Sequence, residues 1–243
     1  RRAGCEGIMG SARILTLALV AGIEAKSAWY TGLDNVLVNP DQDTLTTIGT
    51  TQSDIDNAQF SDARYAVLLT EGTYDLDIPI GYGMSVHGTG ATPSGVTVNT
   101  IHSIDGGNSQ HGGSTQNFWR SAEGLTVKSD AIWAASQAAP LRRIDFQGDL
   151  YLSENGGYSS GGFVGDCSVA GKIDFGTQQQ YMVRSTSMGE AEYSDAGWNY
   201  VFAGSPGAPE GSTTSKASQV TTVDTVVAGL AEKPYLVESD GEW

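Results

Sequence analysis

The residues best suited to chemistry are carboxylates spread through the middle of the chain. Asp145 and Asp166 are 21 residues apart, so in a chain that coils with about that period they would stack ~4.8 Å apart on neighbouring strands. Two carboxylates that close raise the pKa of one of them, as a general acid requires. The spacing predicts Asp145 and Asp166 as a catalytic pair, with Asp149 as the substitute partner if the register shifts. Further acids in the same stretch are Glu154 and Asp174.

The same acids also have a structural interpretation. Asp145 lies inside a strand-like run, while Asp149 and Asp166 lie next to glycines, where carboxylates often cap turns. In that role they would contribute to stability and not to turnover. The residues alone leave both interpretations open.

Aromatic and cationic side chains supply candidates for substrate binding. Three aromatic residues are expected to stack on sugar rings, namely Trp133, Tyr158 and Tyr181. Aromatic residues in strands also form core stacks, so only some of them should face outward. Arg143, with its neighbour Arg142, has the charge with which a polysaccharide lyase would neutralise a uronate.

Motifs for a metal or nucleotide site are lacking in the sequence. It has no Gly-x-Ser-x-Gly, no zinc motif and no Walker loop. His102 and His111 stand nine residues apart in loop-like sequence, which favours solvated histidines over metal ligands. We therefore expect neither a metal site nor a cofactor.

Short β-rich runs must position these residues. Between residues 117 and 184 no apolar run has the length of a helix, and most runs end at Gly, Asn, Asp or Ser. The run Ile144–Gly148 is echoed 29 residues later by Ile173–Gly176, and Val127 and Phe146 stand 19 residues apart. An irregular repeat of roughly 20–30 residues built of short strands predicts a solenoid of β-coils.

Longer phrases carry a resemblance to known proteins. EGTYDLDIPIGYGMSVHGTG (Glu71–Gly90) looks like the first coil of right-handed parallel β-helix proteins of the pectate-lyase-like superfold. NFWRSAEGLTV, WAASQAAPLRRIDFQGDLYLSENGGYSSGGFVGD and GTQQQYMVR resemble a group of secreted β-helix proteins related to family 55 glucanases, which split β-1,3-glucans. The resemblance covers Tyr65–Val237. It implies an all-β, right-handed parallel β-helix whose faces accommodate a sugar polymer.

The ends of the chain suggest a domain organisation. Met9, Arg13, the apolar run Ile14–Ile23 and a small-x-small site read as a signal peptide cut after Ser27. Residues 1–27 are thus expected to be upstream sequence plus signal peptide. Residues 28–64 are expected to form an N-terminal cap, with a short helix at Ser53–Phe60. Residues 65–243 should form the β-helix, which we expect to be truncated at its C-terminus.

The composition narrows the choice of partner. The formal charge of −15 argues against nucleic acid and against an anionic membrane surface. With the signal peptide removed, no membrane insertion is expected, and the predicted location is extracellular. The charge suits a neutral polysaccharide better than a polyanionic one.

Three functions remain open for such a protein. The first is a glycoside hydrolase acting on a β-glucan, the second a non-catalytic glycan-binding or adhesion protein of a cell wall or matrix, and the third a polysaccharide lyase. The sequence does not predict the oligomeric state.

Overall fold

A computed structural model describes residues 28–103, 114–193, 197–213, 219–224 and 233–243. The chain divides into two units, Arg1–Thr31 and Gly32–Trp243. Of the first unit only residues 28–31 are described, in a turn where the Thr31 amide donates to the Ala28 carbonyl (2.9 Å). The predicted signal peptide lies outside the described residues. In the part of the chain that is described, no helix has the length and apolar character needed to cross a membrane.

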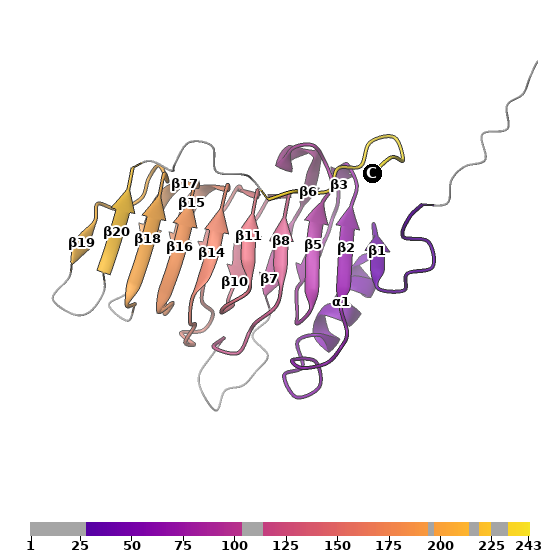
Figure 1. The fold of residues 1–243 in the computed structure, drawn as a ribbon, viewed down its shortest axis with the longest axis horizontal. Helices are drawn as coiled ribbons and strands as arrows, with labels where there is room; N and C mark the ends of the chain where they lie inside the picture. The colour runs from indigo at the N-terminus through magenta and orange to yellow at the C-terminus, as the bar shows by residue number, and fades with distance from the viewer. Residues whose placement is uncertain (1–27, 104–113, 194–196, 214–218, 225–232) are drawn as a thin grey trace, which may run out of the picture. The chain divides into compact units, whose positions relative to one another are not determined.

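The second unit is built on a ten-stranded sheet, here called sheet A, that faces the viewer in Figure 1. All its neighbouring strands are parallel except the last pair. In spatial order they are β1 (Val36–Val38), β2 (Tyr65–Leu69), β5 (Met84–Gly88), β8 (Ser121–Glu123), β11 (Pro140–Arg142), β14 (Gly162–Gly165), β16 (Gln180–Arg184), β18 (Asn199–Ala203), β20 (Gln219–Val223) and β19 (Ser212–Thr213).

A second parallel sheet, sheet B, forms the rest of each coil. One row of it consists of β3 (Gly72–Thr73), β6 (Val96–Val98), β9 (Thr126–Val127) and β12 (Asp145–Phe146), and the other of β4 (Asp77–Pro79), β7 (Thr100–Ser103), β10 (Ala131–Trp133) and β13 (Leu150–Tyr151). Strand β15 (Ser168–Asp174) is long enough to pair with β12 at one end and β13 at the other, so it joins the two rows. Strand β17 (Ser187–Glu192) pairs with β15.

Successive coils advance in the right-handed sense. In Figure 1 the strands of sheet A run upward in front and follow one another from β2 towards β20, with the return segments behind. Glu123, Arg142, Gly165, Arg184 and Ala203 are neighbours across sheet A, at intervals of 19, 23, 19 and 19 residues. The predicted all-β parallel solenoid is confirmed.

One sequence echo proved misleading. Val127 and Phe146 are paired in register, as their spacing suggested. Asp145, however, pairs with Ser168, whereas Asp174 pairs with Tyr151. The two Ile-Asp-Phe phrases therefore occupy different parts of the coil and do not repeat one another.

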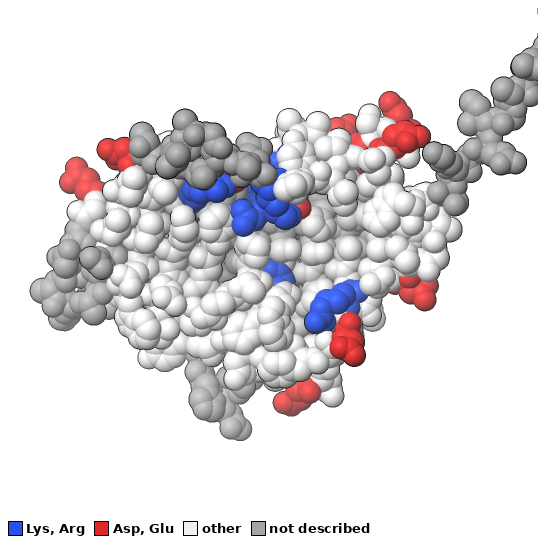
Figure 2. All heavy atoms as spheres, in the orientation of Figure 1, with Lys and Arg blue, Asp and Glu red and all other residues white. Residues whose placement is uncertain are grey.

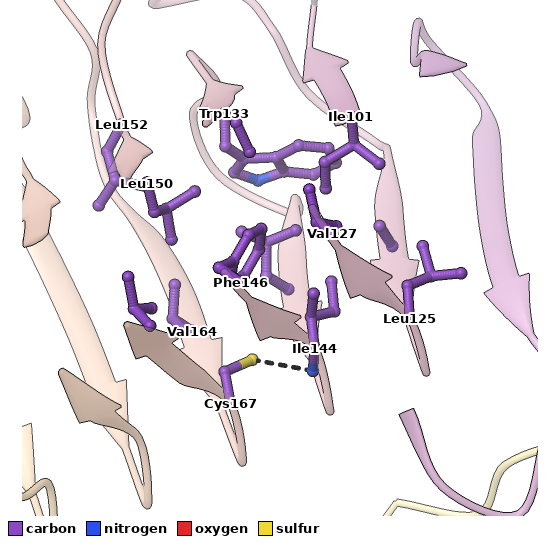
Figure 3. Close-up of a cluster of buried hydrophobic side chains, with 14 of the residues drawn as sticks. Ile101, Leu125, Val127, Trp133, Ile144, Phe146, Leu150, Leu152, Val164 and Cys167 are labelled. Carbon is purple, nitrogen blue, oxygen red and sulfur yellow. Dashed lines mark hydrogen bonds between the residues drawn. The ribbon is translucent and has the colours of Figure 1, made fainter. Parts of the chain in front are cut away.

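The core fills the space between the sheets. Alternate residues of the short strands point inward and stack on the equivalent residues of the next coil, as Figure 3 shows for Val127 and Phe146 beside Trp133. Fully burying each side chain of this size contributes roughly 1.5–3 kcal/mol. The Cys167 thiol also lies here and accepts a hydrogen bond from the Ile144 amide (3.4 Å), and burial raises its pKa to about 12. It is therefore an inert core residue.

One α-helix, α1 (Gln42–Thr51), occurs in the described chain, together with a 3-10 turn at Pro93–Gly95. Asp41 caps α1 by accepting a hydrogen bond from the Thr44 amide (2.8 Å). Gly49 sits where a Cβ would come within 2.6 Å of Pro79, so the helix packs closely on β4. The helix expected at Ser53–Phe60 is wrong, because the side chain of Asp54 accepts from the Asp56 and Asn57 amides and holds that segment in turns.

Candidate functional site

A groove of about 540 Å³ runs across the outer face of sheet A, near the amino ends of its strands. It crosses β11, β14, β16 and β18, which at the spacing of neighbouring strands is a length of about 14 Å. Figure 2 shows this face as mainly white surface, with patches of Lys and Arg and with most acidic atoms at its margins. It is the largest of the described hollows.

The floor of the groove is apolar because one outward row of sheet A carries apolar side chains. Pro140, Phe163, Met182 and Val201 are partners in register on successive strands. Met182 is 40% exposed. A continuous apolar strip thus faces solvent where an outer strand face usually carries polar groups.

Phe163 is held in place by its neighbours. A Cβ on Gly165 would come within 2.5 Å of the Phe163 ring, so the ring lies over the glycine. The guanidinium of Arg142 lies 4.4 Å from the ring centroid and that of Arg184 lies 5.9 Å from it. These cation–π contacts fix the ring beside the groove.

Amides and hydroxyls line the side of the groove. Gln180 and Asn199 are partners in register and both are exposed. The Gln137 amide donates to the Ser160 carbonyl (2.7 Å). An apolar floor with a few polar groups at its edge is typical of sites for small molecules and sugars.

A buried glutamine supports this edge from below. Gln178 donates from Nε2 to the carbonyls of Ala135 (2.9 Å) and Leu152 (2.8 Å), and its Oε1 accepts from the Gly161 amide (2.9 Å). It is 0% exposed. The turns that carry the polar edge are therefore tied together across coils.

Among the described residues that line the groove there is no carboxylate. The acid on the same face, Glu123, lies 2.8 Å from His87 Nδ1 and accepts a hydrogen bond from Lys233 Nζ. Burial disfavours its ionisation, but the bonds from His87 and Lys233 outweigh burial and hold its pKa at about 2. Glu123 is thus a structural anion, unsuited to act as a general acid.

The expected stacking of Asp145 on Asp166 is wrong. Asp145 pairs with Ser168 in the next coil, whose Oγ donates to its carboxylate (2.9 Å). Asp166 lies instead at the corner after β14, with φ +58°, and is paired to Arg184 (2.8 Å). The error arose because the intervening coil has 23 residues and not 21. No described contact gives either residue a catalytic role, which stays a prediction.

Asp149 acts within a turn. Its carboxylate accepts from the Lys172 amide (2.9 Å) and from the Tyr151 hydroxyl (3.2 Å). A Cβ on Gly171 would lie 2.0 Å from Asp149 Oδ1, so the glycine is required for this contact. These contacts agree with the turn-capping interpretation.

The residues predicted to bind substrate are dispersed. Trp133 is fully buried and donates from Nε1 to the Ala139 carbonyl (2.9 Å). Tyr181 lines the groove but is only 4% exposed, with its ring edge-on to Phe175. Tyr158 is 56% exposed and lies outside the groove lining. Arg143 stacks on Tyr235, 3.3 Å from the ring centroid.

Phe163, Met182, Gln180 and Asn199 were the residues missed at the level of sequence. Each follows or precedes an inward residue by one position, so outward orientation was implied once the strands were placed. Their alignment on one row depends on the unequal coil lengths, which the sequence does not show. In the described residues no group of three or more His, Cys, Asp or Glu side chains could hold a metal ion.

The fold and the groove define a parallel β-solenoid whose outer face can hold a polymer with apolar faces and hydroxyl edges. A curated exo-beta-1,3-glucanase of Streptomyces sp. (strain SirexAA-E / ActE) is 39% identical over 183 residues, which are 73% of this chain and 29% of that protein. No family model matches the chain.

Solved structures give the same relationship. The structure of sacteLam55A from Streptomyces sp. SirexAA-E aligns with a TM-score of 0.76 at 35% identity, covering 85% of this chain and 38% of that one. A variant of sacteLam55A in complex with glucose aligns with a TM-score of 0.70 at 35% identity, covering 79% and 35%. The chain therefore spans about a third of the length of the proteins it matches. It is a β-solenoid protein related to a family 55 exo-β-1,3-glucanase, and the resemblance expected from its sequence is confirmed.

Proposed function

We propose that this chain takes part in the hydrolysis of β-1,3-glucan and that its groove on sheet A holds the glucan chain. The observation that carries the proposal is the apolar row of Phe163 and Met182 beside the amides of Gln180 and Asn199. Sugar rings present C–H faces to the first and hydroxyl groups to the second. The relationship to an exo-β-1,3-glucanase supports this choice of polymer.

Binding and bond cleavage are separable in this proposal. Glycoside hydrolysis needs two carboxyl groups on either side of the scissile bond, and the described lining of the groove contains none. The groove would position the polymer, while acids outside this lining would perform the chemistry. Asp145, Asp149 and Asp166 stay candidates for that role.

The lack of a carboxylate in the described lining also favours a second function, glycan binding without hydrolysis. The lyase interpretation has no comparable support, because Arg142 and Arg143 both stack on aromatic rings of the chain itself.

The test measures binding and hydrolysis on the same preparation. We expect calorimetry to detect a β-1,3-glucan oligosaccharide and not a β-1,4-linked one, and reducing-sugar assays to detect glucose release from β-1,3-glucan. Binding without release would select the second function. Absence of both would overturn the proposal.

Secretion is a further part of the proposal, supported by the charged and apolar run of residues 9–27. Expressed in a secretory host, the protein should appear in the medium with its N-terminus near Ala28. N-terminal sequencing checks this, and retention of Met9 on cytosolic protein would contradict it.

A further inference from the structure

Two aromatic rings stand exposed beyond one end of the groove. Phe60 is 80% exposed and Trp119 is 41% exposed, with their ring centroids 5.6 Å apart in an edge-to-face arrangement. They line a hollow of about 290 Å³ whose other walls are the polar residues Gln59, Ser61, Asp62 and Arg64. Large apolar side chains gathered at a hollow in this way mark a binding surface more often than isolated ones do.

The backbone at Trp119 is strained. Its φ is +51°, a region in which a bulky residue is rare and costly. The corresponding corners of sheet A carry Gly83 (φ +68°) and Gly161 (φ +108°), for which this conformation is unstrained. Strain of this kind is found where a side chain has a function, because a glycine would serve the turn better.

The surrounding structure enforces this conformation. The Trp119 carbonyl accepts a hydrogen bond from the Gly83 amide (2.7 Å). The next residue, Arg120, is 2% exposed and donates from Nη1 to the Ile80 carbonyl (2.8 Å). With both sides anchored, the indole is held outward before any ligand arrives.

The aromatic hollow is continuous with the groove. A second hollow of about 290 Å³ lies between them and is lined by Trp119 and Arg64 at one end and by Ala138 and Pro140 at the other. Ala138 and Pro140 also line the groove. From β5 to β18 this path crosses sheet A over about 24 Å, compared with about 14 Å for the groove alone.

The charges at the hollow favour a neutral ligand. Arg64 donates from Nη1 to the carbonyls of Ser61 (2.9 Å) and Ala63 (2.6 Å), so part of its hydrogen-bonding capacity is already used. The carboxylate of Asp62 lines the same hollow. A cation and an anion side by side give no net attraction for an ionic polymer.

We propose that Phe60 and Trp119 form a distal sugar-binding subsite that takes a hexose unit of the same glucan chain that occupies the groove. The inference rests on the proposed function, since it assigns the far end of that polymer. Stacking of the sugar on the rings lengthens the bound segment and so favours long chains over short ones.

The experiment compares a β-1,3-linked trisaccharide, which fills only the groove, with a heptasaccharide, which reaches the rings. Calorimetry is performed on the full chain and on the Phe60→Ala and Trp119→Gly variants. Loss of one stacking partner should weaken heptasaccharide binding about three- to tenfold and leave trisaccharide binding unchanged. Trp119→Gly should retain a melting temperature near that of the wild type, since glycine suits the corner.

Ser185→Gly is the matched control, because Ser185 has φ +48° at a corner of sheet A away from the groove lining. It should alter the affinity for neither oligosaccharide. Heptasaccharide affinity unchanged in both aromatic variants, or an equal loss for both oligosaccharides, would overturn the inference. If the wild-type protein binds neither oligosaccharide, the proposed function itself fails, and that result is visible before any variant is made.

Discussion

At the scale of single residues, glycines decide which aromatic rings reach the surface. A Cβ on Gly162 would lie 2.7 Å from the Tyr181 ring, which therefore packs inward beneath the strand. A Cβ on Gly165 would meet the Phe163 ring, which lies outward beside the groove. The sequence shows the glycines and the aromatics, but it does not show which ring uses which space.

Gly165→Ala should displace the Phe163 ring without removing it. Because the clash involves the far end of the ring, the ring should tilt out of its contact with Arg142, and β-1,3-glucan affinity should fall about three- to tenfold. The free energy of unfolding should change by less than about 1.5 kcal/mol. Calorimetry and urea unfolding measure the two quantities.

Phe163→Tyr is the control for this change, since it keeps both the ring and Gly165. Its affinity should stay close to that of the wild type. Equal affinities for Gly165→Ala and the wild type would show that the position of the ring is irrelevant to binding.

At the scale of elements, hydrogen bonds between coils hold the turns that strands alone do not fix. Gln178 is the clearest case, because its one side chain bonds to the backbone of residues 135, 152 and 161. The sequence suggested an outer amide ladder for Gln178–Gln180 or a turn-capping role. Gln178 has the capping role and Gln180 faces out, a division set by the alternation of side chains along β16.

Gln178→Leu should leave three buried backbone groups without partners. Each such group costs roughly 1–3 kcal/mol, so the free energy of unfolding should fall by about 3 kcal/mol or more. Urea unfolding measures the loss. Gln180→Leu, at an exposed position of the same strand, should change stability by less than about 0.5 kcal/mol, and similar losses in the two variants would contradict this account.

The segment of residues 233–238 is held against sheet A in part by a charge. Lys233 bonds to Glu123, Tyr235 stacks on Arg143, and the Glu238 amide donates to the Thr89 carbonyl (2.8 Å). Because the pKa of Glu123 in the folded protein, about 2, is below its ordinary 4.5, ionised Glu123 stabilises the fold above that ordinary value. The contribution disappears as the pH falls towards 2.

Glu123→Gln should therefore lower stability by up to about 3 kcal/mol near neutral pH. The difference from the wild type should shrink below about pH 4.5 and vanish near pH 2. Thermal unfolding of both proteins across this range measures the difference, from which the titration of other carboxylates cancels. A difference independent of pH would show that the charge of Glu123 does not hold the segment.

At the scale of the whole molecule, the solenoid was predictable and its register was not. Short strands, glycine-bearing corners and phrases such as Glu71–Gly90 sufficed for a parallel β-helix. The alignment of Asp145 with Asp166 failed because coil length varies between 19 and 23 residues, and a shift of a few residues moves a side chain to another face. The groove depends on that register, so its residues were found only in the structure.

Coils that contact only their neighbours should differ in local stability. The central strands β11 and β14 pair on both sides and enclose the largest buried side chains, whereas β20 lies next to the short strand β19. Backbone amides of β11 and β14 should thus exchange with deuterium more slowly than those of β20. Mass spectrometry of peptic fragments measures this, and uniform exchange would instead indicate one cooperative unit.

Strand β19 has a consequence for colloidal behaviour. The outer edge of a parallel sheet is a row of unpaired amides and carbonyls that invites strands of other molecules. At the far side of sheet A this edge is occupied by two residues that turn back and pair antiparallel with β20 (Figure 1). A foreign strand would have to displace them before it could extend the sheet, so this short reversal protects the protein against edge-to-edge polymerisation.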